Sequence, residues 1–162
     1  MNQSYLEAQT FRKNFNARQS YIEKDDSDEI VLDYKYLPEE YRVFPGLSSF
    51  DCSRCEPEQK DLLEEIINQV SNALKTVYYQ YGIIKILPKF EISFDSDDAV
   101  ILNWPYAVYR IYFDIESEVK NSFYGIVIRD FNNSIQTKTE SISKENCASI
   151  VRQIIQYVFN RT

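Results

Sequence analysis

Two cysteines separated by two residues, Cys52 and Cys55, have the spacing of redox-active and metal-binding motifs. They come just before Pro57, where we expect a long helix to begin, and a helix N-terminus together with Arg54 can lower the pKa of a thiol. Zinc would need four ligands, and the sequence offers only one further cysteine, Cys147, and no histidine. Because no strand is predicted directly before the pair, as a thioredoxin-like unit requires, we interpret the two cysteines as structural and expect neither a metal nor a cofactor. A redox pair and a metal shared across a dimer are the alternatives.

A second possible site consists of acidic residues followed by a Glu-x-Lys motif. Glu118 and Lys120 come after Asp114 and after the acidic run Asp95–Asp98. Metal-dependent nucleases of the restriction-enzyme type combine such carboxylates, which hold Mg²⁺, with a lysine that steadies the attacking water. The motif falls in a predicted turn, however, and turns are rich in acidic residues for ordinary conformational reasons. A metal-dependent hydrolase or nuclease is therefore the alternative function and not the leading one.

The sequence contains no histidine. Without this side chain there is no Ser-His or Cys-His nucleophile pair, no HExxH zinc site and no imidazole to act as a base near neutral pH. Most common hydrolase mechanisms are thereby excluded. We expect no catalytic residues and a protein that is not an enzyme.

Acidic residues are concentrated in one part of the chain. The formal net charge is −7, but the stretch from Glu23 to Glu65 holds 14 acidic and 5 basic residues, a net charge of −9, and the rest of the chain has a net charge of +2. Nucleic-acid binding requires a basic footprint, so we expect no direct nucleic-acid binding and instead a protein partner with a basic surface. The partner-binding residues that we expect in this stretch are Asp25, Asp26, Asp28 and Glu29. A solvated, partly disordered segment is the alternative interpretation.

A third group of residues combines aromatic and charged side chains on a predicted strand. The sequence has 13 tyrosines, and several of them lie between residues 104 and 124. On the strand from Tyr109 to Glu116, the residues predicted to point outward are Arg110, Tyr112 and Asp114. Exposed aromatic and arginine side chains are typical of binding hot spots, so we predict that these three residues also contact a partner.

The residues from Lys89 to Phe131 are predicted to form four consecutive strands of an antiparallel meander. Apolar residues alternate with polar ones from Phe90 to Asp95 and from Tyr109 to Glu116, the period of a strand with one buried face. Asp95–Asp98 and the stretch from Glu118 to Ser122 provide the turns. Residues from Ile135 to Thr139 add a possible fifth strand.

Two helices are predicted on either side of these strands. Pro57 suits a first helical turn, apolar residues then recur every three or four positions as far as Tyr81, and Gly82 favours a left-handed stop. Ser143 can cap a final helix, whose apolar stripe includes Cys147, Val151, Ile154, Ile155 and Val158. The predicted fold is α+β, with a four- to five-stranded antiparallel meander packed against a long helix and a C-terminal helix.

The residues before the long helix are predicted to form an extended acidic arm. A short helix is possible in residues 1–22, a strand from Ile30 to Leu37, and loop in residues 39–56. We therefore divide the chain into an N-terminal arm, residues 1–56, and a core domain, residues 57–162. The arm is expected to lie on the core or to be ordered by a partner.

Composition favours a soluble protein of one domain. The chain of 162 residues is 44% hydrophobic, which is enough to bury a core. We see neither an apolar run of about 18 residues, as a membrane span requires, nor the apolar stretch of a secretory signal. Three cysteines fit reduced thiols better than a disulfide framework. We expect a cytoplasmic protein with no membrane contact, and we make no prediction of its oligomeric state.

The order of elements from Lys89 to Phe159 resembles a group of small uncharacterised bacterial proteins. The resemblance covers the strand Phe90–Phe94, an acidic turn, the strand from Val100 to Trp104, a strand ending in Phe113-Asp114, one further strand and a closing helix. Some members of that group lie near toxin–antitoxin or phage-defence genes. The resemblance implies a fold and a genomic setting. It does not imply an activity.

These observations lead to one principal expectation about function. The chain is expected to be a non-enzymatic protein-interaction module, either antitoxin-, immunity- or inhibitor-like, or an accessory subunit of a bacterial defence or phage counter-defence complex. The alternative is the metal-dependent hydrolase that would use the carboxylates of the meander.

Overall fold

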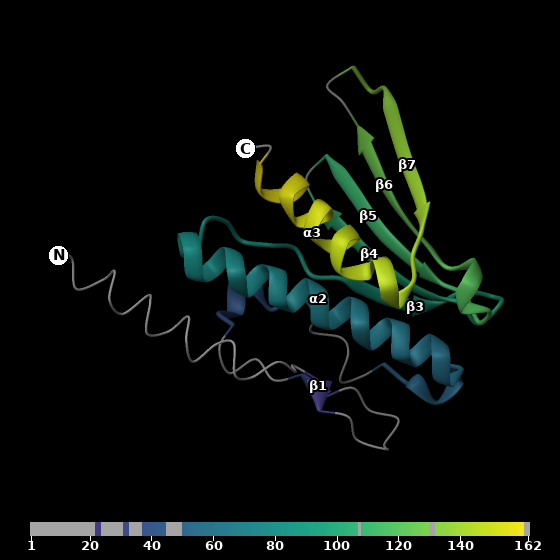
Figure 1. Cartoon of the computed structure of the whole chain (residues 1–162). Helices are drawn as coiled ribbons and strands as arrows, with labels where there is room; N and C mark the ends of the chain where they lie inside the picture. Colours follow the sequence, from purple (N-terminus) through teal and green to yellow (C-terminus); the bar gives the residue numbers. More distant parts are fainter. Residues whose placement is uncertain are drawn as a thin grey trace.

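The computed structural model describes residues 37–44, 50–106, 108–129 and 132–160, together with the backbone of residues 22–23 and 31–32 (Figure 1). Those two short segments, β1 (Ile22–Glu23) and β2 (Val31–Leu32), form an antiparallel pair. The helix predicted before them and most of the strand predicted from Ile30 to Leu37 lie outside the described residues.

The central element is a five-stranded antiparallel meander. Its strands follow one another in space as in the sequence: β3 (Glu91–Phe94), β4 (Val100–Tyr106), β5 (Tyr109–Ile115), β6 (Phe123–Arg129) and β7 (Ile135–Ser141). Asp95 supports the first turn, because its Oδ1 accepts hydrogen bonds from the backbone N–H groups of Asp97 and Ala99 at 2.8 and 2.9 Å. The four predicted strands, the possible fifth strand and the α+β class are all confirmed.

The long helix α2 (Pro57–Tyr81) begins and ends at the predicted residues. A capping box of Glu56 and Gln59 satisfies donors of the first turn, and Gly82 adopts a φ of 71°, a conformation that disfavours any side chain. Buried Gln59 also donates hydrogen bonds from Nε2 to the backbone oxygens of Asp98 and Ile115, at 2.9 and 2.8 Å. The start of α2 is thereby joined to the turn before β4 and to the last residue of β5.

The buried stripe of α2 differs from the predicted apolar one most clearly at Tyr81 and Lys75. Tyr81 is 69% exposed, whereas Lys75 is fully buried, and burial lowers the pKa of its ammonium group to about 8. The sequence pattern assigned Tyr81 to the buried stripe because its helical phase is right. It lies in the last turn of α2, next to Ile83 and Ile84, which are also exposed.

The second helix, α3 (Lys144–Asn160), packs against α2, and both helices lie on the same face of the sheet (Figure 1). Its buried stripe includes Ile150 in addition to the five predicted residues. The helices and the inward-facing residues of the strands share one hydrophobic core, in which Trp104, Phe113 and Tyr124 are among the largest buried side chains.

Residues 37–44 and 50–55 of the predicted arm contribute to this same core. Tyr41, Val43 and Phe44 are each at most 1% exposed, and the N–H of Phe90 donates a hydrogen bond of 2.7 Å to the backbone oxygen of Val43. The short 3-10 helix η1 (Glu39–Tyr41) and the residues after it lie against the chain that leads into β3, and a second 3-10 helix, η3 (Cys52–Arg54), comes just before α2. The domain boundary at residue 57 stays a prediction.

Candidate functional site: the open face of the sheet

The sheet has one face that neither helix covers. Side chains alternate across the strands, so those that point away from α2 and α3 form a continuous surface, which we call the open face. Its central members are paired across β3, β4, β5 and β6, and they are Glu91, Ile101, Asn103, Arg110, Tyr112, Asp114, Phe123 and Val127.

A row of polar side chains crosses three strands of the open face. Asn103 donates a hydrogen bond of 2.8 Å from Nδ2 to Oε2 of Glu91, and its Oδ1 accepts one of 2.9 Å from Nε of Arg110. The amide of Asn103 thus links a carboxylate on β3 to a guanidinium on β5. Arg110 is exposed but held in a defined orientation.

An aromatic cluster lies next to this row. Tyr112 pairs with Gly125 on β6, and its ring lies so close that a Cβ at residue 125 would be 2.2 Å from Cζ of the tyrosine. Phe123 meets the same ring edge-on, with centroids 6.1 Å apart and an interplanar angle of 89°. The absent side chain of Gly125 therefore lets Tyr112 lie flat on the sheet. Both aromatic rings are half-buried and accessible from outside.

Asp114 is the carboxylate of the open face with the most unusual environment. Its Oδ1 is buried and has no hydrogen-bond partner among the described residues. Burial, with smaller contributions from the nearby carboxylates of Glu116 and Asp95, raises the pKa of Asp114 to about 6. A buried carboxylate oxygen without a partner costs free energy, so its presence calls for an explanation.

The structure brings together three of the predicted site residues and leaves four untested. Arg110, Tyr112 and Asp114 share the outward face of β5, as predicted. Their role in binding stays a prediction. The four acidic residues of the arm, Asp25, Asp26, Asp28 and Glu29, lie outside the described residues.

Sequence reasoning missed two members of the polar row, Glu91 and Asn103. The available signal was the short connection between Tyr106 and Tyr109, which is typical of a tight hairpin. In the structure these two residues are paired, and the same register places Asn103 opposite Tyr112. Combining that register with the alternation of side chains would have put Asn103 on the same face as Arg110.

The two cysteines before α2 lie in and next to η3. Cys52 is buried and Cys55 is half-buried, and the backbone N–H of Cys55 donates a hydrogen bond of 3.0 Å to the oxygen of Cys52. A hydrogen bond from the thiol of Cys52 lowers the pKa of the Cys55 thiol and raises that of Cys52 itself. Arg54 pairs with Asp98 and lies 4.4 Å from the ring centroid of Phe94, so it ties η3 to the turn between β3 and β4.

The Glu-x-Lys motif lies in a turn, as predicted. Glu118 is the N-cap residue of the short 3-10 helix η4 (Val119–Asn121), which contains Lys120, and Nζ of Lys120 is 3.2 Å from a carboxylate oxygen of Glu118 on an exposed surface. Within the described part of the chain, no group of three or more cysteine and carboxylate side chains is arranged to hold a metal ion. The hydrolase alternative stays a prediction.

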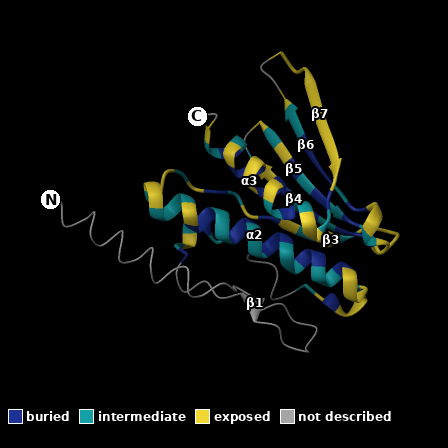
Figure 2. Ribbon diagram, viewed as in Figure 1, coloured by how far each residue is buried: buried dark blue, intermediate teal, exposed yellow. Residues whose placement is uncertain are grey.

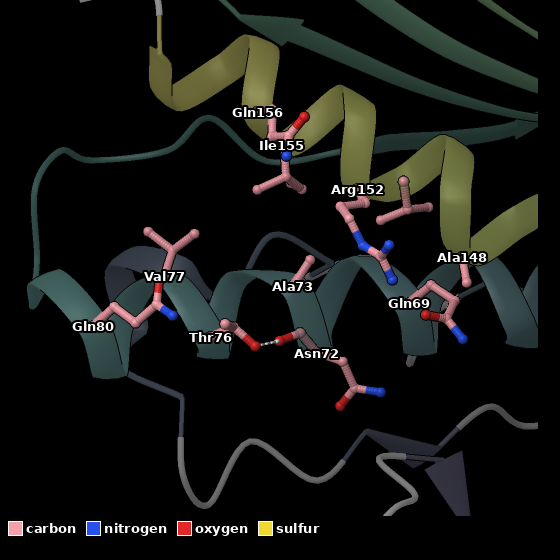
Figure 3. Close-up of a pocket in the computed structure, with 11 residues that line it drawn as sticks. Gln69, Asn72, Ala73, Thr76, Val77, Gln80, Ala148, Arg152, Ile155 and Gln156 are labelled. Carbon is pink, nitrogen blue, oxygen red and sulfur yellow. Dashed lines mark hydrogen bonds between the residues drawn. The ribbon is translucent and has the colours of Figure 1, made fainter. Parts of the chain in front are cut away.

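A groove with a volume of about 370 Å³ lies between α2 and α3 (Figure 3). Small and branched apolar residues such as Ala73, Ala148 and Ile155 alternate along it with amide side chains such as Gln69 and Gln156. The described residues that line the groove include an arginine but no carboxylate or thiol. The groove can form hydrogen bonds but lacks the usual acid–base groups.

The fold is that of a small α+β protein in which both described helices cover the same side of the sheet. No protein-family model, curated protein or solved structure matches the chain. In the portion of the chain that the structure describes, no helix is both long enough and apolar enough to cross a membrane.

Proposed function

We propose that this chain is a protein-binding module without catalytic activity that holds a partner with a basic surface on its open face. The observation that carries this proposal is Asp114, whose buried Oδ1 has no hydrogen-bond partner among the described residues. A lysine or arginine of the partner placed beside the Asp114 carboxylate would offset the cost of burying its negative charge.

The carboxylates around Asp114 favour a cation over any other ligand. Glu116 and Asp95 lie close enough to oppose its ionisation, so the local potential is negative. A positive side chain placed between these groups would be attracted by all three carboxylates. A negatively charged or phosphate-bearing ligand would be repelled by the same groups.

The neighbouring side chains provide the rest of a binding surface. Tyr112 and Phe123 offer apolar area that is already fixed in place, and Arg110 is held by Asn103, so little side-chain entropy is lost when a partner binds. Tyrosine and arginine are also the residue types that dominate measured binding hot spots.

The biological setting of this function rests on the resemblance of Lys89–Phe159 to small bacterial proteins encoded near toxin–antitoxin or phage-defence genes. We place the chain among antitoxin-, immunity- or inhibitor-like proteins, or among accessory subunits of a bacterial defence or phage counter-defence complex. A cytoplasmic location fits that setting. The acidic stretch from Glu23 to Glu65 would add long-range attraction for a basic partner.

The test is capture of the partner with matched variants. Wild-type protein, an open-face variant (Tyr112→Ala with Asp114→Asn) and a helix-side variant (Arg152→Ala with Gln156→Ala) are immobilised and exposed to a lysate of the bacterium that encodes the chain. We expect a basic protein to be retained by the wild type and the helix-side variant and lost by the open-face variant, with circular dichroism showing that all three are folded.

Two results would contradict the proposal. Equal retention of the same proteins by the open-face variant would exclude this surface as the binding site. Mg²⁺-dependent cleavage of nucleic acid by the wild type, abolished by Glu118→Gln, would favour the hydrolase instead.

A further inference from the structure

The strand β7 lies at an edge of the sheet and is exposed along its whole length. All seven of its residues are exposed (Figure 2), and among the described residues it pairs with β6 alone. In Figure 1 the end of β6 and the start of β7 lie away from both helices. Its backbone therefore has a row of N–H and C=O groups that are directed away from the sheet and available to another strand.

The hydrogen bonds of β6 show which residues form that row. The N–H of Ile142 donates to the backbone oxygen of Ser122 at 3.0 Å, which continues the pairing of Ser141 with Phe123. Hydrogen-bonded and non-hydrogen-bonded pairs alternate along an antiparallel ladder. The residues of β7 whose backbone groups point outward are therefore Ile135, Thr137, Thr139 and Ser141.

The side chains between them carry a balanced pair of charges. Nζ of Lys138 is 3.2 Å from Oε1 of Glu140, and the hydroxyl of Tyr124 donates a hydrogen bond of 2.9 Å to Oε2 of the same glutamate. These contacts lower the pKa of Glu140, so it is a carboxylate at neutral pH. β7 is thus a neutral strand with one positive and one negative residue two positions apart.

We propose that two copies of this chain pair antiparallel through β7, with Thr139 opposite Thr139 of the second copy. A twofold axis would then pass between the two Thr139 residues. On each side of this axis, Thr137 of one copy lies opposite Ser141 of the other, and Lys138 lies opposite Glu140. The two five-stranded sheets would join into one continuous sheet.

Charge selects this register from those that the backbone allows. In any such pairing, the residues of β7 whose backbone groups point away from β6 must lie opposite one another. This condition holds when the twofold axis is placed at any single residue of β7, so the possible registers differ in the position of the axis by one residue. Centring the pair on Lys138 or on Glu140 places like charges directly opposite, and centring it on Thr137 leaves Lys138 facing Gln136. Of these four registers, only the one with its axis at Thr139 places Lys138 of each copy opposite Glu140 of the other.

Two features of the fold favour β7 over the other edge of the sheet. β3 is short, and the chain leading into it is already bonded to residues 37–44 through Val43. β7 is longer, and both its faces are exposed, so α3 would not obstruct a second copy. A lysine in an edge strand usually discourages pairing, but here Glu140 supplies its counter-charge.

Sedimentation velocity at concentrations from about 10 µM to about 1 mM tests the dimer, because strand pairing alone forms a small interface and a weak complex. We expect the wild type to dimerise as its concentration rises. Lys138→Glu and Glu140→Lys should each weaken the dimer at least tenfold, and the double variant K138E/E140K should restore it. A wild type that stays monomeric throughout would overturn the proposal, as would a dimer that is indifferent to the single variants.

Cysteine crosslinking tests the register independently. Thr139→Cys places two thiols on opposite residues about 5.5 Å apart at Cα, within the range of a disulfide. Thr137→Cys places them about 13 Å apart along the strands, which is too far. Under mild oxidation we expect a covalent dimer from the first variant and none from the second. Crosslinking of Thr137→Cys instead would show that the register is wrong.

Discussion

At the scale of single residues, the Asp114 carboxyl group connects binding with stability. Its pKa of about 6 in the folded protein lies above the ordinary value of 3.8. Between these pH values the folded protein retains a proton that the unfolded chain has lost, so the contribution of Asp114 to stability falls as the pH rises from about 4 through 6. At neutral pH the ionised group destabilises the fold. Such a cost is expected where a residue serves binding.

We therefore predict that Asp114→Asn raises the melting temperature at pH 7.5 and has little effect at pH 4. Asparagine has the same shape but no charge to bury, so it removes the penalty only where aspartate is ionised. Asp97→Asn, in the exposed turn before β4, serves as the control for replacing a carboxylate with an amide outside the open face. A melting temperature lowered equally at both pH values would mean that Asp114 stabilises the fold through an interaction other than charge.

Gly125 is the residue that fixes the position of Tyr112. We predict that Gly125→Ala lowers the free energy of unfolding by about 1–3 kcal/mol, since the new methyl group would displace a packed ring. Partner binding should weaken as well, because Tyr112 could no longer lie flat on the sheet. In the double variant Tyr112→Ala/Gly125→Ala the loss of stability should be smaller than the sum of the two single losses. Additive losses in chemical denaturation would contradict the close packing of the two residues.

At the scale of elements, the segment 37–44 belongs to the core although it precedes both helices. Leu37, Tyr41, Val43 and Phe44 are buried with the residues of α2 and the strands. The hydroxyl of Tyr41 accepts a hydrogen bond of 3.1 Å from the N–H of Ile84, just after α2 ends. Removing this segment would expose apolar surface on the core and leave backbone groups near β3 unpaired.

We predict that a chain of residues 37–162 folds cooperatively and that a chain of residues 57–162 does not. The shorter chain lacks three aromatic or branched side chains with at most 1% exposure, and each such side chain contributes about 1.5–3 kcal/mol when buried. That loss is comparable with the total stability of a small domain. The check is thermal unfolding followed by circular dichroism, together with size-exclusion chromatography. Cooperative melting of residues 57–162 would instead support a domain boundary at residue 57.

At the scale of the whole molecule, charge and contact are expected to act on different steps of binding. Negative charge is concentrated in the stretch between Glu23 and Glu65, which has a net charge of −9, whereas the open face provides the short-range contacts. Long-range attraction accelerates encounter and is screened beyond about 10 Å at 0.1 M salt. Buried contacts mainly determine how long the complex persists.

Once the partner is known, we predict two separable effects in surface plasmon resonance. Reversing the charges of Asp25, Asp26, Asp28 and Glu29 should slow association and reduce its dependence on salt, with a smaller change in dissociation. Arg110→Ala or Tyr112→Ala should mainly speed dissociation. An association rate that is insensitive to salt and to the four reversals would rule out steering by the acidic arm.

The sequence by itself determined the class of fold and the bounds of its strongest elements. Alternation from Phe90 to Asp95 and from Tyr109 to Glu116 indicated strands with one buried face, and Pro57 and Gly82 marked the two ends of α2. These signals are local, because period, capping and turn chemistry depend on residues within a few positions of one another. They also placed Arg110, Tyr112 and Asp114 on one face.

Only the tertiary structure decided what surrounds those residues. The link from Glu91 through Asn103 to Arg110 and the flat position of Tyr112 on Gly125 depend on which strands are neighbours and in what register. The burial of the Asp114 oxygen, which has no partner among the described residues, depends on the same arrangement. The exposure of β7 depends in turn on how far the helices extend over the sheet. Burial and pairing of this kind arise between residues distant in the chain, and no local pattern contains them.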